Sequence, residues 1–117
     1  MANDDEARRV FTLTEARALL PRVREMTAAA VRDAEPLASV LDDTAEDDPA
    51  RTKLTTDLKR VVDDWVEQIQ EMGLEAKGLW LVDFDNGEGY YCWKHPEPSV
   101  SHYHGYDDGF AGRMKIV

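Results

Sequence analysis

The residues best suited to chemistry in this sequence gather in its last third. Within thirteen positions stand the only cysteine of the chain, all three histidines and a glutamate: Cys92, His95, Glu97, His102 and His104. Thiol, imidazole and carboxylate groups bind metals, transfer protons and attack electrophiles. We therefore expect any metal or catalytic chemistry of this protein in the last third of the chain.

A strand places alternate side chains on opposite faces, and this alternation divides the residues around the cysteine into two sets. One set is aromatic and aliphatic and is predicted to face the core: Trp80, Val82, Phe84, Tyr91, Trp93 and Tyr103. The other set contains Asp83, Cys92, His102 and His104, which converge if the strands pair in the corresponding register. These four residues are the predicted metal ligands, and their donor atoms suit zinc or iron.

Each of these residues also has an ordinary structural interpretation. No Cys-x-x-Cys pair or His-Glu-x-x-His helix accompanies them, and a register slip of one residue moves Cys92 to the opposite face. Cys92 is then a small buried hydrophobic residue. His95 precedes a proline and is expected in an exposed connection. His102 and His104 are alternatively half-exposed strand residues bonded to backbone carbonyls or water.

The end of the chain offers a second candidate site. Residues 109–113 are Gly-Phe-Ala-Gly-Arg, a turn in which two glycines allow close backbone approach and Phe110 is a predicted anchor. Arg113 is expected either to bind a small anion together with His104 or to form an ion pair with Glu97. The ion pair is favoured in so acidic a chain. No phosphate-binding loop, nucleophile elbow or dinucleotide fingerprint is found, which disfavours the common cofactor enzymes.

The elements that position these residues begin with a helix. Thr12 and Glu15 have the spacing of a capping box, and apolar residues then recur every three or four positions. This pattern predicts one helix over about residues 13–41. Pro21 and Pro36 each remove an amide donor, so we expect a kink or a break near one of them, with the break at Pro36.

A second helix is predicted from Pro49 or Ala50 to Met72, because apolar residues again recur at helical spacing and Gly73 is placed to end it. The acidic residues between the helices lack the ligand order and turn glycine of a calcium loop. They are expected to form a solvated connection. The two helices therefore make an antiparallel hairpin.

Beyond Gly73 the periodicity changes to that of strands. Residues 79–84 and 89–93 are predicted strands joined by a turn at Asn86-Gly87, and residues 100–106 return as a third strand. The predicted fold class is α+β: a long antiparallel helical hairpin packed with a small three-stranded antiparallel β-meander.

Length, charge and composition limit the partners. The 117 residues predict a single domain, with a flexible N-terminus at 1–10, the hairpin at 11–73 and the sheet and C-terminal turn at 74–117. A formal net charge of −10 repels nucleic acids and anionic membranes. No apolar run suits a membrane span, no signal peptide begins the chain, and one cysteine fits a reducing compartment. We expect a cytoplasmic protein that binds neither nucleic acid nor membrane.

The helices predict a partner of another kind. Three strands are too few to cover two long helices, so apolar helix surface remains to be buried. A second copy of the hairpin buries it in a four-helix arrangement, and we expect a homodimer. The alternative is a monomer whose sheet covers the whole apolar stripe.

The two ends of the chain together resemble an uncharacterised prokaryotic family, the domain of unknown function numbered 2203. The matching stretches are Phe-Thr-Leu-Thr-Glu-Ala at 11–16, Leu-Leu-Pro at 19–21, Gly-Leu at 78–79, Val-Asp-Phe at 82–84, Cys-Trp-Lys at 92–94, Glu-Pro at 97–98, His104 and Gly-Phe-Ala-Gly-Arg at 109–113. The resemblance implies a small cytoplasmic protein made of a helical hairpin and a small sheet, and it supplies no activity. It also implies that His95 and His102 are particular to this chain, which leaves Asp83, Cys92, Glu97, His104 and Arg113 as the stronger site residues.

The sequence therefore supports three functional hypotheses. The first is a non-catalytic, dimeric structural or interaction protein, because a long apolar stripe stands beside no recognisable catalytic motif. The second is a metal-binding protein or small metalloenzyme that uses zinc or iron at Cys92, His102 and His104, with Asp83 or Glu97 as the oxygen ligand. The third is a small anionic-ligand pocket around Arg113 and His104.

Overall fold

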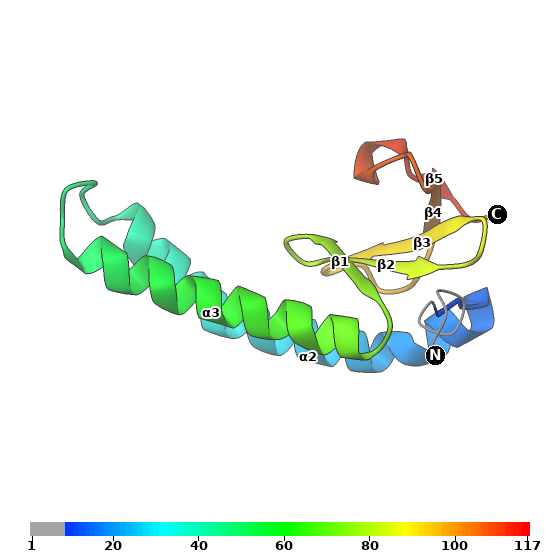
Figure 1. Ribbon diagram of the computed structural model, residues 1–117, viewed down its shortest axis with the longest axis horizontal. Helices are drawn as coiled ribbons and strands as arrows, with labels where there is room; N and C mark the ends of the chain where they lie inside the picture. Colours follow the sequence, from blue (N-terminus) through cyan, green and yellow to red (C-terminus); the bar gives the residue numbers. More distant parts are fainter. Residues whose placement is uncertain (1–8) are drawn as a thin grey trace, which may run out of the picture.

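The computed structural model of the protein describes residues 9–117 and contains two helices followed by an antiparallel sheet (Figure 1). The first helix, α2, spans Leu13–Asp42. The Thr12 hydroxyl accepts a hydrogen bond from the Glu15 amide at 3.1 Å, and the Glu15 carboxylate accepts one from the Thr12 amide at 2.9 Å. These bonds satisfy two amides that a helix start leaves without partners. The predicted capping box is confirmed.

Of the N-terminus predicted to be flexible, residues 1–8 lie outside the described residues. Arg9 is described, and its guanidinium donates to the Met72 carbonyl oxygen at 3.0 Å. The backbone amide of Phe11 donates to the carbonyl oxygen of Asp85 at 2.7 Å. The chain therefore contacts the end of the second helix and the sheet before α2 begins.

The first helix continues through both of its prolines, so the predicted break at Pro36 is wrong. A proline has a φ that suits a helix and costs mainly one hydrogen bond and a local clash. Pro21 and Pro36 are both exposed. The opposite side of α2 carries an uninterrupted buried stripe: Ala16, Leu20, Val23, Thr27, Ala30, Val31 and Ala34. The stripe continues on both sides of Pro21, and its burial offsets the hydrogen bond lost there, whereas Pro36 lies just beyond its last residue, Ala34.

The second helix, α3, spans Ala50–Glu71 and runs antiparallel beside α2 (Figure 1). Trp65 is buried between the helices, and its indole nitrogen donates to the Thr27 hydroxyl at 2.9 Å. Gly73 follows the helix with a φ of +81°, a left-handed conformation that glycine adopts without steric cost. The helical hairpin and its termination at Gly73 are confirmed.

The sheet has five strands where three were predicted. The strands are β1 Glu75–Gly78, β2 Leu81–Asp85, β3 Gly89–Lys94, β4 His102–Gly105 and β5 Met114–Lys115, and they lie in that order, each antiparallel to its neighbour. The predicted meander corresponds to β2, β3 and β4. The strands at the two edges were missed because they have only four and two residues and no alternation of apolar and polar side chains.

A turn at Leu79 and Trp80 separates β1 from β2, so these two residues lie outside the strand in which they were predicted. Trp80 has a φ of +63°, which is costly for a bulky residue. Its ring packs edge-on against Trp65, with the ring centres 5.0 Å apart. This aromatic contact with α3 compensates for the unfavourable backbone conformation.

The register sorts the strand residues into the two predicted faces. Val82 lies opposite Trp93 and Phe84 opposite Tyr91 on the inner face, which packs on the helices. The core shared by the helices and this face contains Phe11, Ala16, Leu20, Val23, Ala30, Trp65, Ile69, Leu74, Val82, Phe84, Trp93 and Val100. Tyr103 was also predicted to be a core residue, but its exposed fraction is 38%. The alternation of apolar and polar residues predicts on which face of the sheet a side chain lies. It does not predict whether a helix covers that position.

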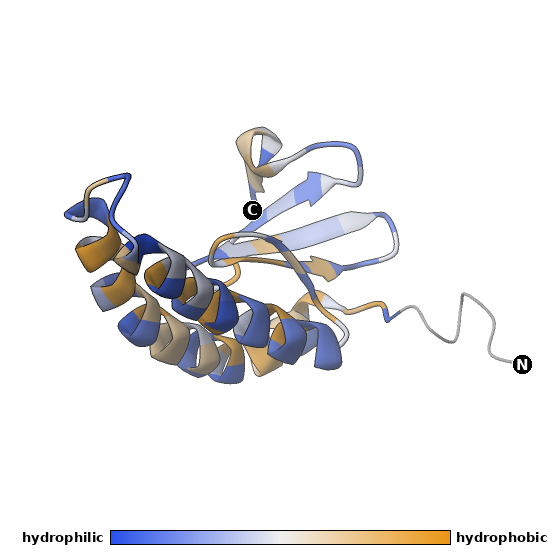
Figure 2. Ribbon diagram, turned by 60° about the vertical axis from the view of Figure 1, so that its left-hand side comes forward, coloured by the Kyte–Doolittle hydropathy of each residue, from blue (hydrophilic) through white to orange (hydrophobic). Residues whose placement is uncertain are grey.

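The sheet lies over only one end of the hairpin, where α2 begins and α3 ends (Figure 1). The opposite end, which we call the distal hairpin, comprises residues 37–58 and projects beyond the sheet. Both helices alternate apolar and hydrophilic patches along their length (Figure 2). In the distal hairpin Leu37, Leu41, Leu54 and Leu58 are only half-buried. In the described part of the chain, neither helix has a stretch apolar enough to cross a membrane.

Candidate metal centre

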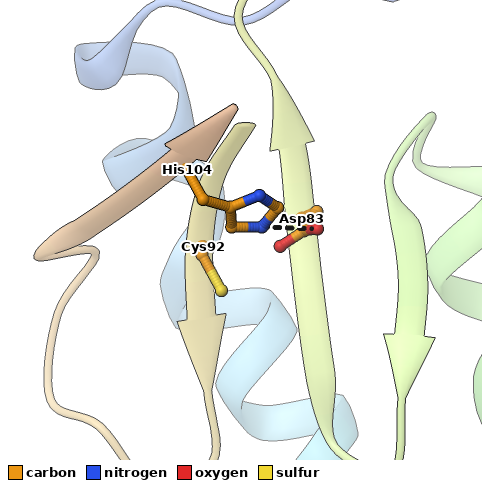
Figure 3. A group of neighbouring side chains, drawn as sticks. All are labelled: Asp83, Cys92 and His104. Carbon is orange, nitrogen blue, oxygen red and sulfur yellow. Dashed lines mark hydrogen bonds and ion pairs between the residues drawn. The ribbon is translucent and has the colours of Figure 1, made fainter. Parts of the chain in front are cut away.

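Three neighbouring strands direct Asp83, Cys92 and His104 toward one another on the outer face of the sheet (Figure 3). Asp83 on β2 lies opposite Cys92 on β3, while His104 on β4 lies opposite Tyr90, two residues before the cysteine. One carboxylate oxygen, the thiol sulfur and one imidazole nitrogen lie within 4.8 Å of one another. Within residues 9–117 no other group of three such ligands is as close. We call these three residues the metal-ligand triad.

The triad is buried although each of its members is polar. The exposed fractions are 1% for Asp83, 0% for Cys92 and 4% for His104. Burial of a polar group without a full set of partners costs free energy, and for a charged group this cost is large. The partners of each group therefore decide what the triad can do.

His104 has an acceptor on each side of its ring. Its Nδ1 lies 2.9 Å from the carbonyl oxygen of Gly105, and its Nε2 lies 3.0 Å from Oδ2 of Asp83. Because a carbonyl oxygen only accepts, Nδ1 carries a proton and donates it to Gly105. The lone pair of a neutral ring would then face the carboxylate. The contact therefore requires a proton, on Nε2 or on the Asp83 carboxyl, or a metal ion between the two groups.

Asp83 and Cys92 also lack a complete environment. Oδ1 of Asp83 is buried and has no hydrogen-bond partner among the described residues. Burial raises the pKa of Asp83, and the neighbouring thiol and imidazole offset this only in part. Burial, together with the nearby Asp83 carboxylate, raises the pKa of Cys92 to about 12. A thiol with this pKa is protonated at neutral pH and is a poor nucleophile.

Glu97 and Arg113 form a bidentate ion pair beside the triad. The guanidinium donates to Oε1 at 2.9 Å and to Oε2 at 3.0 Å, and the Lys94 amide donates to Oε1 at 2.8 Å. Partial burial alone would raise the pKa of Glu97, but the bonds from Arg113 and Lys94 hold it below its ordinary value. Arg113 also lies close enough to Cys92 to oppose the rise in the thiol pKa. The ion pair thus joins the C-terminal turn to the sheet next to the triad.

The other two histidines lie outside the triad. His102 is opposite Cys92 in the register, but its Nδ1 is 3.7 Å from Oε2 of Glu97 and it is not among the three close ligands. His95 packs edge-on against Trp93, on the side of the sheet that faces the helices, with ring centres 6.2 Å apart. The structure therefore brings together three of the four predicted metal ligands.

The connection between β3 and β4 is held in place by hydrogen bonds to its backbone. The indole of Trp93 donates to the Glu97 carbonyl at 2.8 Å, and Arg17 of α2 donates to the Val100 carbonyl at 3.2 and 3.3 Å. Val100 is fully buried in the core. These contacts determine where β4 begins, and therefore which histidine reaches the triad.

A cavity of about 360 Å³ adjoins the triad and has Asp83 and His104 in its wall. Tyr90, Tyr106 and residues 107–110 of the C-terminal turn form other parts of the wall. Sequence reasoning missed this cavity. Tyr90 and Tyr106 share the alternation of Cys92 and His104, and that shared face was the signal that two tyrosines belong beside the predicted ligands.

The helical hairpin, the antiparallel meander and the buried triad define a small α+β protein with a candidate metal centre on the outer face of its sheet. Residues 9–116 match the family described as uncharacterized conserved protein, DUF2203. The chain belongs to this family, and the resemblance in its sequence is confirmed. Searches among curated proteins and among solved structures found no match.

Proposed function

We propose that the protein binds a divalent transition metal, with zinc the preferred ion, through Asp83, Cys92 and His104. The observation that carries this proposal is the orientation of His104. Its Nδ1 donates to the Gly105 carbonyl, which leaves Nε2 directed at Asp83 and near Cys92. Histidine ligands of metals commonly donate their second ring N–H to a carbonyl or carboxylate in this way.

The donor set supports zinc over the harder cations. Sulfur, imidazole nitrogen and carboxylate oxygen are the three ligand types of zinc proteins, whereas magnesium and calcium prefer oxygen alone. Bonds of about 2.0–2.3 Å place neighbouring ligand atoms of a tetrahedral zinc about 3.3–3.8 Å apart. The ligand atoms of the triad already lie within 4.8 Å of one another, so small side-chain movements bring them to bonding distance.

A bound cation also resolves the unfavourable features of the triad. It takes the place of the proton required between Nε2 of His104 and Asp83, and it displaces the proton of the Cys92 thiol. Oδ1 of Asp83, which is buried without a partner, becomes available as a ligand or as an acceptor for a metal-bound water. Three protein ligands leave a fourth tetrahedral position, as in catalytic zinc sites.

The two other functions predicted from the sequence have weaker support. Both terminal nitrogens of the Arg113 guanidinium donate to Glu97. The guanidinium is therefore already paired with a carboxylate, which disfavours binding of an additional anion. The homodimer and its structural role stay a prediction that rests on the half-buried leucines of the distal hairpin and on Val40, which is 53% exposed. Sedimentation showing a monomer at micromolar concentration would refute the dimer.

The metal proposal is tested with protein that is produced without a histidine tag and stripped with a chelator. Titration with zinc followed by elemental analysis is expected to give about one zinc per chain. Cobalt in place of zinc is expected to produce a thiolate charge-transfer band in the near ultraviolet. Absence of zinc after titration of folded protein would refute the proposal.

Matched variants separate the triad from the other histidines. Cys92→Ser and His104→Gln are each expected to weaken zinc binding by at least about 100-fold. Cys92→Ser is also expected to remove the cobalt–thiolate band, because it removes the thiolate. His95→Gln and His102→Gln remove an imidazole elsewhere in the segment and are expected to leave both measurements unchanged. Circular dichroism of each stripped variant establishes that it is folded.

A further inference from the structure

The cavity beside the triad combines the metal ligands with aromatic and acidic side chains. Asp83 and His104 lie in its wall next to Leu81, and the rings of Tyr90, Tyr106 and Phe110 enclose it further. Its volume of about 360 Å³ is at the lower end of the range for small-molecule sites. Asp83 is one of the wall residues, and its Oδ1 is buried without a partner among the described residues. The cavity therefore has room for a small molecule that reaches the triad.

Charge at the cavity selects the kind of molecule. Lys77 is the one lysine or arginine among its wall residues, and Glu75 neutralises that ammonium at 3.0 Å. A divalent ion bound by the carboxylate of Asp83 and the thiolate of Cys92 is balanced by those two negative charges. Asp107 and Asp108 then outnumber the Lys94 ammonium, which lies 5.0 Å from the centre of the Phe110 ring, and leave this part of the cavity negative. This charge distribution repels anions and attracts cations.

The two aspartates of the turn have different surroundings. The side chain of Asp108 lies between Gly105 and Gly112, where an added Cβ would come within 2.9 Å of its Oδ2 and 3.1 Å of its Cβ respectively. Asp108 thus fills the inside of the turn and helps to shape it. Asp107 is exposed at the cavity and forms no ion pair with residues 9–117. Asp107 is therefore the carboxylate available to a ligand.

The rings around the cavity already contact cations of the protein. The Lys77 ammonium lies 4.7 Å from the centre of the Tyr90 ring, and the Arg113 guanidinium lies 4.2 Å from the centre of the Phe110 ring. Tyr106 packs edge-on against Tyr90 at 5.1 Å, and its hydroxyl donates to Asp85 at 2.6 Å. The rings are held in place by these contacts, and they offer apolar surface to the body of a ligand.

We propose that this cavity binds a small organic amine, whose ammonium pairs with Asp107, whose apolar body packs on the aromatic wall, and whose second polar group ligates the metal. The inference rests on the proposed metal site, because the metal provides the third point of attachment. It identifies the ligand as a cation with an apolar body and excludes small anions as preferred ligands.

A pair of hydroxamates that differ by one ammonium tests the proposal. L-Phenylalanine hydroxamate carries the amine, and 3-phenylpropionohydroxamate has the same ring, chain and metal-binding group without it. Calorimetry on zinc-loaded protein is expected to show about tenfold tighter binding of the amine, which is the effect of one added charge pair. In Asp107→Asn the two compounds are expected to bind with equal affinity. Asp47→Asn, which removes an exposed acid from the distal hairpin, is expected to preserve the tenfold difference.

The outcomes separate the two proposals. Protein that takes up no zinc refutes the metal site, and the ligand inference falls with it. Zinc-loaded protein that binds both hydroxamates equally, that prefers the compound without the amine, or that binds neither refutes the ligand inference and leaves the metal site standing. If Asp47→Asn as well as Asp107→Asn loses the tighter binding of the amine, the net charge of the protein causes that tighter binding. Such a result would refute the pairing of the ligand ammonium with Asp107.

Discussion

At their centres the two faces of the five-stranded sheet are buried to the same degree, but they differ in chemistry. On the inner face Val82, Phe84 and Trp93 have no exposed surface and pack on the helices. On the outer face Cys92 and Asp83 are equally buried, at 0% and 1% exposure. Hydrophobic burial accounts for the inner face. It does not account for an outer face that buries a carboxylate oxygen without a partner.

This difference indicates which residues serve stability and which serve binding. The central side chains of the inner face, Val82, Phe84 and Trp93, are fully buried in the core that the sheet shares with the helices. The outer face holds two groups whose pKa values are raised by burial, and a histidine nitrogen whose contact with Asp83 requires a proton or a metal ion between them. Perturbed groups of this kind cluster at functional sites. We therefore expect substitutions on the inner face to lower the stability of the fold, and substitutions in the triad to weaken ligand binding.

The largest expected effect is a loss of stability from the inner face. Trp93→Ala removes a fully buried indole and its hydrogen bond to Glu97, and we expect it to lower the free energy of unfolding by about 3–5 kcal/mol. Cys92→Ala, on the outer face of the same strand, is expected to cost less than half as much in metal-free protein. Urea denaturation measures both values, and equal losses would contradict the comparison.

The next effect concerns stabilisation by the metal. Free zinc at about 100 times its dissociation constant is expected to raise the free energy of unfolding of the unaltered protein by about 2.7 kcal/mol. His104→Gln is expected to gain no more than about 0.4 kcal/mol under the same conditions, because zinc then only reaches its weakened dissociation constant. Trp93→Phe, a change on the inner face, serves as the control and is expected to keep the full gain in urea denaturation with and without chelator.

A smaller effect is expected from the ion pair beside the triad, and it depends on pH. Glu97→Gln is expected to cost about 1–2 kcal/mol at neutral pH because it removes charge-assisted bonds to Arg113. The folded-state pKa of Glu97 lies below its ordinary value of 4.5, so its stabilising contribution is complete above that value and is lost as the pH falls through the folded-state pKa.

The stability difference between Glu97→Gln and the unaltered protein should therefore narrow below pH 4.5, as urea denaturation over this range would show. Glu67→Gln replaces an exposed carboxylate of α3 and should give no difference at any pH. A difference for Glu97→Gln that stays constant down to about pH 3 would exclude the ion pair as its cause.

The smallest effect is expected at Tyr103, which shares the inner face with Trp93 but is 38% exposed. Tyr103→Ala is expected to lower the free energy of unfolding by less than about 1 kcal/mol, since the ring is not enclosed. Thermal unfolding next to Trp93→Ala provides the measurement. A loss as large as that of Trp93→Ala would mean that a partner covers Tyr103 in solution.

Pairing of the first two candidate ligands was predictable from local sequence. Gly87 adopts a φ of +91°, and the Asn86 side chain accepts bonds from the Glu88 and Gly89 amides at 2.9 and 2.8 Å. This turn fixes the register of β2 against β3, because hairpin register follows from the type and length of the turn. Asp83 and Cys92 are therefore placed on one face by residues close to them in sequence.

The choice between His102 and His104 was not predictable in the same way. Both have the alternation of the outer face, and a seven-residue connection from 95 to 101 leaves the register of β4 open. The register depends on contacts that are distant in sequence, among them the hydrogen bonds from Arg17 to Val100. The edge strands were missed for a related reason, since the neighbouring strand, not their own sequence, makes them extended.

The distal hairpin projects beyond the sheet, so its length can change without altering the geometry of the site. Matched insertions of seven residues, one in each helix beside the 43–49 connection, preserve the helical phase and extend the hairpin by about 10 Å. The ligand strands keep their register under such a change. An insertion between β2 and β4 would instead alter the spacing of Asp83, Cys92 and His104. The reach of the hairpin can therefore change without altering the site, whereas a change in the length of the loops between the ligand strands alters it.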